Sequence, residues 1–266
     1  MSWMDFVKAW RRYVDGRAPV PSAAPERPPA GDDDAPLEQP LILTVPPPPG
    51  ADEFTAALRS AGDLLASLQP RFGPTWERLK PRVEAAREAE RERLYSAAVL
   101  RQVPELLEWA QVDGEGETFL TLAELALQPV LRPFAATLVA GRSLAAWRRP
   151  FCPVCGREAD VARIRPDNLR FLHCPVCDTE WPVTRLSCVW CGADDPKKVQ
   201  FFTLEVLEPW RVDTCEVCGG YMKTLDQRSG GPLAMPGVDL FVEDARTLQL
   251  DLLAQREGFR RGGRAH

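Results

Sequence analysis

Histidine is the scarcest chemically versatile residue in this chain of 266 residues, with only His173 and His266 present. A Ser-His-Asp or Cys-His arrangement needs a histidine beside its nucleophile, and His266 is the last residue of the sequence. No nucleophile supported by a histidine is therefore visible in the sequence, and we expect a protein that is not an enzyme.

The sequence also lacks a long apolar run. The most apolar stretch, residues 119–140, is interrupted by Glu124, Pro129, Arg132 and Pro133, whereas a membrane-spanning helix needs about 20 largely apolar residues. The N-terminal stretch MSWMDFVKAWRR contains no apolar run of the length that a signal peptide requires. We therefore expect a cytoplasmic protein without a membrane span, in which the apolar stretch forms buried helices.

Excess positive charge is missing as well. The net charge is −5, and residues 151–228 contain ten basic and twelve acidic side chains. Nucleic-acid binding relies on clustered positive charge that neutralises phosphates. These counts argue against a nucleic-acid-binding zinc ribbon protein, an alternative that a salt-dependent shift of labelled DNA or RNA would support.

Composition changes along the N-terminal half predict three segments. Apolar residues at helical spacing predict an amphipathic helix over 1–16, which packs on its own protein or docks on a partner, and we favour the first. Residues 17–50 contain eleven of the 26 prolines and predict a disordered linker. Residues 51–149 predict a helical domain of about four to six helices. Its last two helices are expected at 119–131 and 132–147, with prolines at helix starts or kinks.

All eight cysteines fall in CxxC pairs, which are Cys152/Cys155, Cys174/Cys177, Cys188/Cys191 and Cys215/Cys218. In a reducing cytoplasm this pattern indicates metal or redox chemistry rather than disulfides. A two-residue gap lets both sulfurs of a pair reach one tetrahedral ion. The residue after each second cysteine is expected at positive φ, and it is glycine in three pairs and Asp178 in the fourth.

The spacing of the pairs predicts how they combine. The intervals are 18, ten and 23 residues, and the ten-residue interval is cramped for a hairpin that returns to the same ion. We therefore pair the first with the second in a ribbon over 150–187 and the third with the fourth in a ribbon over 188–228. Two other pairings remain open at this point. His173, beside Cys174, is an alternative ligand, although four thiolates already complete each site.

Each predicted site has four protein ligands and no open position, which indicates a structural role rather than catalysis. Zinc and iron both suit such sites, and the residues do not choose between them. The expected cofactors are two iron or zinc ions, one per tetracysteine site.

Short β-type runs predict small hairpins in the C-terminal half, at 162–165, 169–173, 180–186, 199–207 and 210–215. Residues 229–266 predict a loop, a C-terminal helix over 237–259 and a tail, with Leu240, Leu248, Leu252 and Leu253 as the main apolar positions of the helix. The fold class is therefore α+β, with an N-terminal helical bundle followed by two tandem rubredoxin-like or zinc-ribbon tetracysteine modules and a C-terminal helix.

The series CPVCG, LRFLHCPVCDTEWPVTRLSCVWCG and VDTCEVCGGYMKTLDQ, followed by VDLFVEDARTLQLDLLAQREGF, resembles the FdhE family of formate dehydrogenase accessory proteins. The likeness is strongest over residues 151–259, and the elements LHCxxCxTEW and CxxCGxYxK are specific in combination. The chain departs from the family at Arg157, Glu158 and Ala159, where a small residue and proline are usual.

The resemblance implies a cytoplasmic maturation factor with a helical N-terminal domain and paired rubredoxin-like ribbons that bind iron. It also implies a partner, the catalytic subunit of a molybdenum or tungsten formate dehydrogenase. The metal ligands of the family fall on the eight cysteines, and no catalytic residue carries over. An iron-tetrathiolate redox protein is the main alternative, although it leaves the helical domain without a role.

Overall fold

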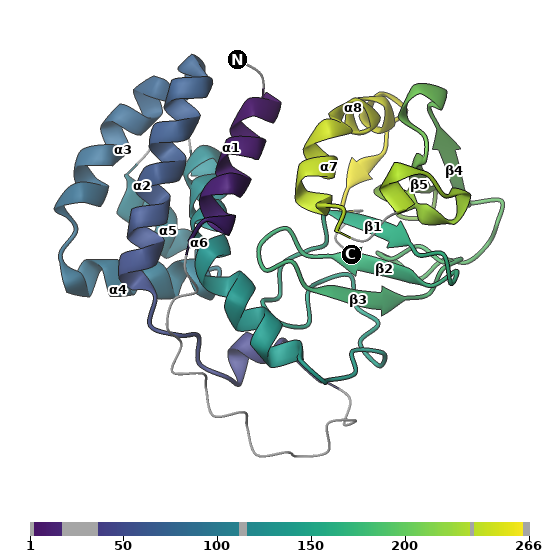
Figure 1. The fold of residues 1–266 in the computed structure, drawn as a ribbon, viewed down its shortest axis with the longest axis horizontal. Helices are drawn as coiled ribbons and strands as arrows, with labels where there is room; N and C mark the ends of the chain where they lie inside the picture. Colours follow the sequence, from purple (N-terminus) through teal and green to yellow (C-terminus); the bar gives the residue numbers. More distant parts are fainter. Residues whose placement is uncertain (1–2, 18–36, 112–115, 235–236, 263–266) are drawn as a thin grey trace. The chain divides into compact units, whose positions relative to one another are not determined.

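The computed structural model describes residues 3–17, 37–111, 116–234 and 237–262 (Figure 1). The chain divides into two compact units, and each is described by itself. The helical unit comprises Met1–Asp33 and Leu41–Ala140, and the sheet unit comprises Asp34–Pro40 and Gly141–His266.

The helical unit is an α-helical bundle, drawn in purple to teal in Figure 1. Its helices are α1 Trp3–Asp15, α2 Ala51–Leu68, α3 Gly73–Ala85, α4 Glu88–Val99, α5 Val103–Ala110 and α6 Gly116–Val139. Helix α2 lies at the centre, because it contacts α1, α3, α4 and α6. Its buried stripe includes Phe54, Ala57, Leu58 and Ala61, spaced at three and four residues as an amphipathic helix requires.

The amphipathic helix at the N-terminus packs within this unit. Phe6 and Trp10 of α1 are fully buried, and the indole Nε1 of Trp10 donates a 2.9 Å hydrogen bond to Oε1 of Gln128 in α6. At the end of α1, Arg132 of α6 forms an ion pair with Asp15 at 2.7 Å. Of the two interpretations of this helix, packing on its own protein is therefore the one observed.

Helix α6 is a single helix of 24 residues that contains Pro129 and Pro133, so the prediction of two helices divided at these prolines was wrong. Each proline removes one helical N–H donor, but its fixed φ suits a helix, and burial of the surrounding side chains outweighs the cost. By length and composition, α6 alone among the described helices could cross a membrane. However, 61% of its apolar window is buried inside the protein, as in a core helix.

The predicted linker, residues 17–50, lies partly outside the described residues, which resume at 37. Leu41 and Ile42 form a buried helical turn, and Tyr95 donates a 2.9 Å hydrogen bond to the carbonyl oxygen of Pro48. After the N-terminal segment, the helical unit resumes at Leu41, and residues 141–149 group with the sheet unit.

The sheet unit contains one mixed sheet that joins both cysteine-bearing halves. Its strands are β1 Val161–Ile164, β2 Arg170–His173, β3 Glu180–Val183, β4 Val199–Thr203, β5 Trp210–Cys215, β6 Gly220–Asp226 and β7 Arg260–Arg261. The order is β3-β2-β1-β6-β5-β4, with β7 beside β6. Strands β1 and β6 run parallel, with Val161 opposite Lys223, and so connect the two ribbons.

Strands β1 to β5 lie where the sequence predicted them, but β6 was missed. It is the strand through which the two ribbons are joined, and its residues from Gly220 to Leu225 are all buried. Lys223 and Thr224 interrupt its apolar pattern, so the segment does not read as a buried strand.

The C-terminal helix is divided in two, α7 Leu240–Arg246 and α8 Leu248–Arg256, so the single helix predicted over 237–259 was wrong. The break occurs at Thr247, whose hydroxyl is fully buried and donates to the carbonyl oxygen of Glu243 at 2.9 Å. Thr55 and Thr121 make the same bond inside unbroken helices, so this bond alone does not end α7.

The break also changes which side chains face the sheet. Leu250 and Ala254 of α8 are fully buried, whereas Leu248 and Leu252, two of the main apolar positions predicted for the helix, are about half exposed, at 49% and 53%. The core that α7 and α8 form with the sheet contains Val161, Trp210, Val212, Tyr221, Leu225, Leu240, Leu250 and Ala254. Figure 1 shows both helices beside the strands that they cover.

Candidate metal centres

The four CxxC turns share one backbone geometry. In each, the residue after the second cysteine has positive φ: 74° at Gly156, 57° at Asp178, 76° at Gly192 and 69° at Gly219. Its N–H donates to the carbonyl oxygen of the first cysteine, over distances from 2.8 to 3.0 Å. The prediction of positive φ at these positions is confirmed, and both sulfurs of every pair thereby point to the same side of the turn.

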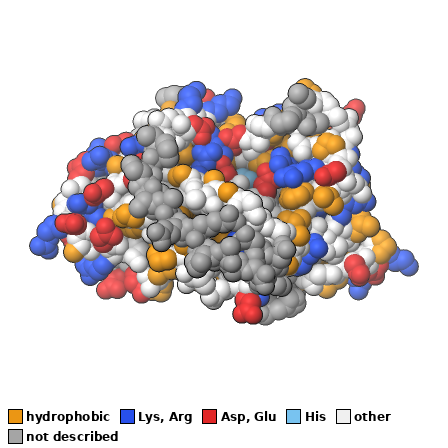
Figure 2. Space-filling view, turned by 60° about the horizontal axis from the view of Figure 1, so that its bottom comes forward, with side chains coloured by type: hydrophobic (Ala, Val, Ile, Leu, Met, Phe, Trp, Pro, Cys, Tyr) orange, Lys and Arg blue, Asp and Glu red, His pale blue; other side chains and the backbone are white. Residues whose placement is uncertain are grey.

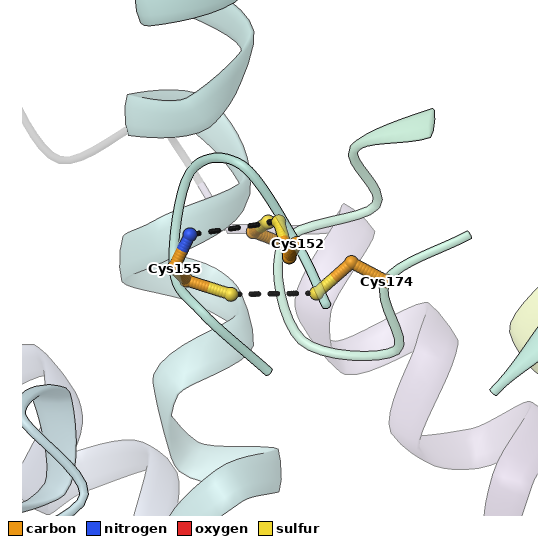
Figure 3. Close-up of side chains that lie close together, drawn as sticks. Cys152, Cys155 and Cys174 are labelled. Atoms are coloured by element: carbon orange, nitrogen blue, oxygen red, sulfur yellow. Dashed lines mark hydrogen bonds between the residues drawn. The ribbon is translucent and has the colours of Figure 1, made fainter. Parts of the chain in front are cut away.

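The first centre contains Cys152 and Cys155 from the turn before β1, and Cys174 and Cys177 from the turn after β2. The Sγ atoms lie 3.5 Å apart for Cys152 and Cys177 and 3.4 Å apart for Cys155 and Cys174, which point toward each other in Figure 3. All four Sγ atoms lie within 4.8 Å of one another, and all four residues are buried. Backbone N–H groups of Val154 and Cys155 approach Sγ of Cys152 at 3.3 and 3.5 Å.

The second centre contains Cys188 and Cys191 from the loop before β4, and Cys215 and Cys218 from the turn between β5 and β6. Its Sγ atoms lie 3.7 Å apart for Cys188 and Cys218 and 3.7 Å apart for Cys191 and Cys215. These four ligand atoms also lie within 4.8 Å of one another, but Cys191 is partly exposed. The eight cysteines therefore gather into the two groups of four that their spacing predicted.

The separations between sulfur atoms fit a metal site and not a disulfide. A disulfide requires about 2.05 Å between sulfurs, and the cysteines are free. Four thiolates around one ion at about 2.3 Å in a tetrahedron lie about 3.8 Å apart. The observed values of 3.4 to 3.7 Å are close to this spacing, so each group can hold one metal ion.

The pKa shifts of the thiols also favour a bound metal ion in each group. Burial raises the pKa of Cys152 and Cys174 well above the ordinary cysteine value. Burial acts the same way on Cys155, but hydrogen bonds with the three neighbouring thiols hold its pKa well below that value. Four crowded thiols do not all ionise without a cation, because their charges repel. A coordinated divalent ion deprotonates them, which fits zinc or iron.

The second centre also combines thiols of raised pKa with a thiol of lowered pKa. Burial raises the pKa of Cys188 and of Cys218, and repulsion from the charges of neighbouring thiols raises both pKa values further. Burial raises the pKa of Cys191 less than the backbone N–H of Ala193 and the neighbouring thiols lower it, so its net shift is downward. The thiol whose pKa is lowered is thus the partly exposed one.

His173 is a residue of β2, not a sulfur-group ligand. Its Nδ1 lies 2.8 Å from Oδ1 of Asp160, and its Nε2 lies 3.5 Å from Oδ1 of Asp178. Burial lowers the pKa of His173, but the carboxylate of Asp160 outweighs this and raises it to about 10. Both ring nitrogens therefore face carboxylates, and the imidazolium adds positive charge beside the first thiolate group.

Sequence reasoning missed other residues around the first centre. Oγ1 of Thr179 lies 3.1 Å from Sγ of Cys177, and buried Arg157 donates to the carbonyl oxygen of Cys155 at 3.4 Å. Thr179 had a signal, because it is part of the quoted LHCxxCxTEW element. Arg157 stands where the chain departs from the family pattern, and it places a cation beside the thiols. Such neighbours orient ligands and tune the bound metal.

The fold and the two centres define an α+β double-tetracysteine protein with a helical unit. Comparison with known proteins narrows this class. Residues 151–185 match the family model described as FdhE, central domain.

Curated relatives agree with this match. The chain is 36% identical over 137 residues to an FdhE homologue of Aquifex aeolicus, covering 50% of this chain and 46% of the relative. It is 33% identical over 132 residues to an FdhE homologue of Enterobacter sp. (strain 638), covering 47% and 40%. It is 29% identical over 204 residues to Protein FdhE of Salmonella paratyphi A, covering 74% and 60%. The chain thus spans about half the length of the curated relatives it matches.

A solved structure has the same fold. The crystal structure of the FdhE protein from Pseudomonas aeruginosa superposes with a TM-score of 0.63 at 20% identity, over 98% of this chain and 85% of that one. The family model, the curated relatives and the solved structure thus agree that this chain is similar to FdhE proteins.

Proposed function

We propose that this protein is a cytoplasmic accessory factor for formate dehydrogenase, which binds the catalytic subunit of that enzyme during its maturation. The observation that carries the proposal is the pair of closed four-cysteine groups within an FdhE fold. In this proposal the eight cysteines bind two metal ions, one per group. The protein acts by binding its client and not by catalysing a reaction.

The chemistry of the two groups supports a structural role for the metals. Each bound ion would hold together two CxxC turns and the hairpin between them, because metal binding supplies much of the folding free energy of small ribbons. With four thiolates per ion, no position remains for a substrate or water. The sheet then serves as a rigid frame from which side chains present themselves to a partner.

Two measurements on protein purified anaerobically from its native cells test this function. Elemental analysis is expected to find about two ions of iron or zinc per chain. Affinity capture from cells that make formate dehydrogenase is expected to retain its catalytic subunit. Absence of that subunit from the captured material, with the tagged protein folded and metal-loaded, would contradict the proposal.

A redox role is the second candidate, and the exposure of Cys191 favours it. Electron transfer requires a metal near the surface, and the second centre reaches the surface through this sulfur. An iron-loaded protein is then expected to have a visible ferric-thiolate band that a mild reductant bleaches reversibly. A colourless protein that contains only zinc would exclude electron transfer through these sites.

A further inference from the structure

The sheet unit has a cleft of about 660 Å³ that none of the eight cysteines lines. Its walls come from separate segments of the unit, namely β2, the loop after β3, β4, β5 and the turn after β6. The metal centres therefore do not account for it, although the same strands position both.

The cleft lies on the sheet face opposite α7 and α8. Successive side chains of a strand point to opposite faces, and Val212 of β5 belongs to the core formed with α8. Its neighbours Arg211 and Asp213 consequently point to the other face. Phe201 of β4 is paired with Asp213 and shares that face.

Apolar side chains are exposed along one wall. Phe201 is 59% exposed and Leu186 is 70% exposed, and both line the cleft. In the described part of the chain, β4 pairs with β5 only, so its other edge offers unpaired backbone groups. An exposed strand edge with apolar side chains suits an extended peptide, which would add its own backbone hydrogen bonds there.

Arginine dominates the charged part of the lining. Four arginines line the cleft with two aspartates, and they are Arg170, Arg185, Arg211 and Arg228 against Asp194 and Asp213. The carboxylate of Asp213 pairs with two of these guanidinium groups, with Arg170 at 2.7 Å and Arg211 at 2.9 Å. Asp226, which does not line the cleft, also pairs with Arg211 at 3.5 Å. The lining therefore carries more positive than negative charge.

The other two arginines of the lining donate hydrogen bonds to the same neutral amide oxygen. Oδ1 of Asn168 accepts hydrogen bonds from Nη1 of Arg185 at 2.8 Å and from Nη1 of Arg228 at 3.1 Å. Arg228 also pairs with Asp226, whereas Asn168 is the partner that Arg185 has in the structure. A carboxylate would bind these groups more strongly than an amide, because charge-assisted hydrogen bonds are roughly twice as strong.

We propose that this cleft binds an extended acidic segment of the client protein. Its carboxylates pair with Arg185 and Arg228, and an apolar side chain of the segment packs on Phe201 and Leu186. The proposal rests on the proposed function in naming the client as the source of the segment. On the face that Figure 2 shows, acidic and basic side chains of the described residues are interspersed with apolar ones.

The first test uses the full-length, metal-loaded protein and a fluorescein-labelled peptide in which aspartate alternates with leucine. Fluorescence anisotropy is expected to detect binding that weakens about tenfold or more in the R185E/R228E variant, because two attractive charges become repulsive. R256E, which reverses an exposed arginine of α8, is the matched control and is expected to bind as the wild type does. Thermal melts of all three proteins verify that they are folded.

Further probes separate charge from shape. F201A is expected to weaken the peptide without altering its salt dependence, and the same peptide with lysine in place of aspartate is expected not to bind. Equal binding by the wild type and R185E/R228E would overturn the proposal. Tighter binding of a single-stranded oligonucleotide than of the acidic peptide, lost in R185E/R228E, would also overturn it and identify a nucleic-acid surface.

A second readout separates this inference from the proposed function. Capture of the formate dehydrogenase catalytic subunit by wild type and R256E, but not by R185E/R228E, supports both. Equal capture by all three leaves the proposed function intact and overturns the cleft as the binding surface. Peptide binding without capture of that subunit by the wild type supports an acidic-segment site and contradicts the formate dehydrogenase client.

Discussion

The two tetracysteine centres have the same turns and the same number of thiols, but they differ in their surroundings. All four cysteines of the first centre are buried, and His173, Arg157 and Thr179 lie around them. In the second centre, Cys191 is partly exposed. The same CxxC turns thus produce one centre enclosed by protein and one that solvent can reach.

The second centre has a different kind of support. Strand β7 pairs with Gly220, two residues after Cys218, and buried Lys223 of β6 pairs with Asp244 of α7 at 2.6 Å and Asp251 of α8 at 2.5 Å. The chain's C-terminal segment therefore holds the strand that follows the second centre, and near the first centre Arg261 donates to the carbonyl oxygen of Asp160 at 2.8 Å. The comparison predicts that metal retention at the second centre depends on residues far along the chain.

Replacing one cysteine of a centre is expected to have the largest effect on metal content and stability, and this effect is expected to differ most between the two centres. Structural metal sites contribute on the order of 10 kcal/mol to folding, and a serine in the fully buried first centre cannot recruit water as a substitute. C174S is therefore expected to lose its ion and unfold the sheet unit, whereas C191S keeps a folded first centre with about one ion per chain. Elemental analysis and circular dichroism melts check this. Equal destabilisation by both variants would contradict the difference between the centres.

Removal of the buried lysine is expected to destabilise the second centre. Among the residues that the structure describes, K223M leaves Asp244 and Asp251 with Arg261 as their charged partner. Breaking a buried ion pair costs about 3–5 kcal/mol. Urea denaturation of the metal-loaded protein measures the loss. K197M, at an exposed position of the same unit, is the control and is expected to leave the free energy of unfolding unchanged. A K223M protein as stable as K197M would show that the C-terminal segment does not support the centre.

Metal release is expected to occur in two phases. Excess chelator reaches the second centre through Cys191 but needs local unfolding to reach the first, so we expect one ion to leave about tenfold faster than the other. Stopped-flow absorbance with a chromogenic chelator measures both phases, and C191S should lack the fast one. A single phase that releases both ions together would mean that the exposure of Cys191 has no kinetic consequence.

The glycines that follow the second cysteine in three of the four pairs provide the smallest test. An alanine at positive φ costs about 1–2 kcal/mol, and at Gly156 its Cβ would also lie 3.3 Å from Cγ of Pro40, whereas Gly192 has no neighbour within 4 Å. G156A is therefore expected to lower the free energy of unfolding more than G192A. G192N, with a residue type that tolerates this conformation, should lose less than G192A. The reverse order for the two alanine variants would contradict this account of the turns.

The sequence alone determined the local features of this protein. A two-residue gap between cysteines and the glycine or aspartate that follows are constraints within one turn, so the positive φ values were predictable before the fold. The intervals between pairs limited which turns share a centre, because a short loop cannot return to its own ion. The amphipathic stripe of α1 and the strands β1 to β5 were visible for the same reason, since their periodicity is local.

Only the tertiary structure decided the features that depend on distant residues. The buried strand β6 contains Lys223, which the sequence cannot identify as paired until Asp244 and Asp251 are placed beside it. The break at Thr247 turns Leu250 rather than Leu248 toward the sheet. It follows from packing rather than from helix propensity. The unequal burial of the two centres has the same origin. Burial is set by neighbours from elsewhere in the chain, and ligand spacing carries no information about them.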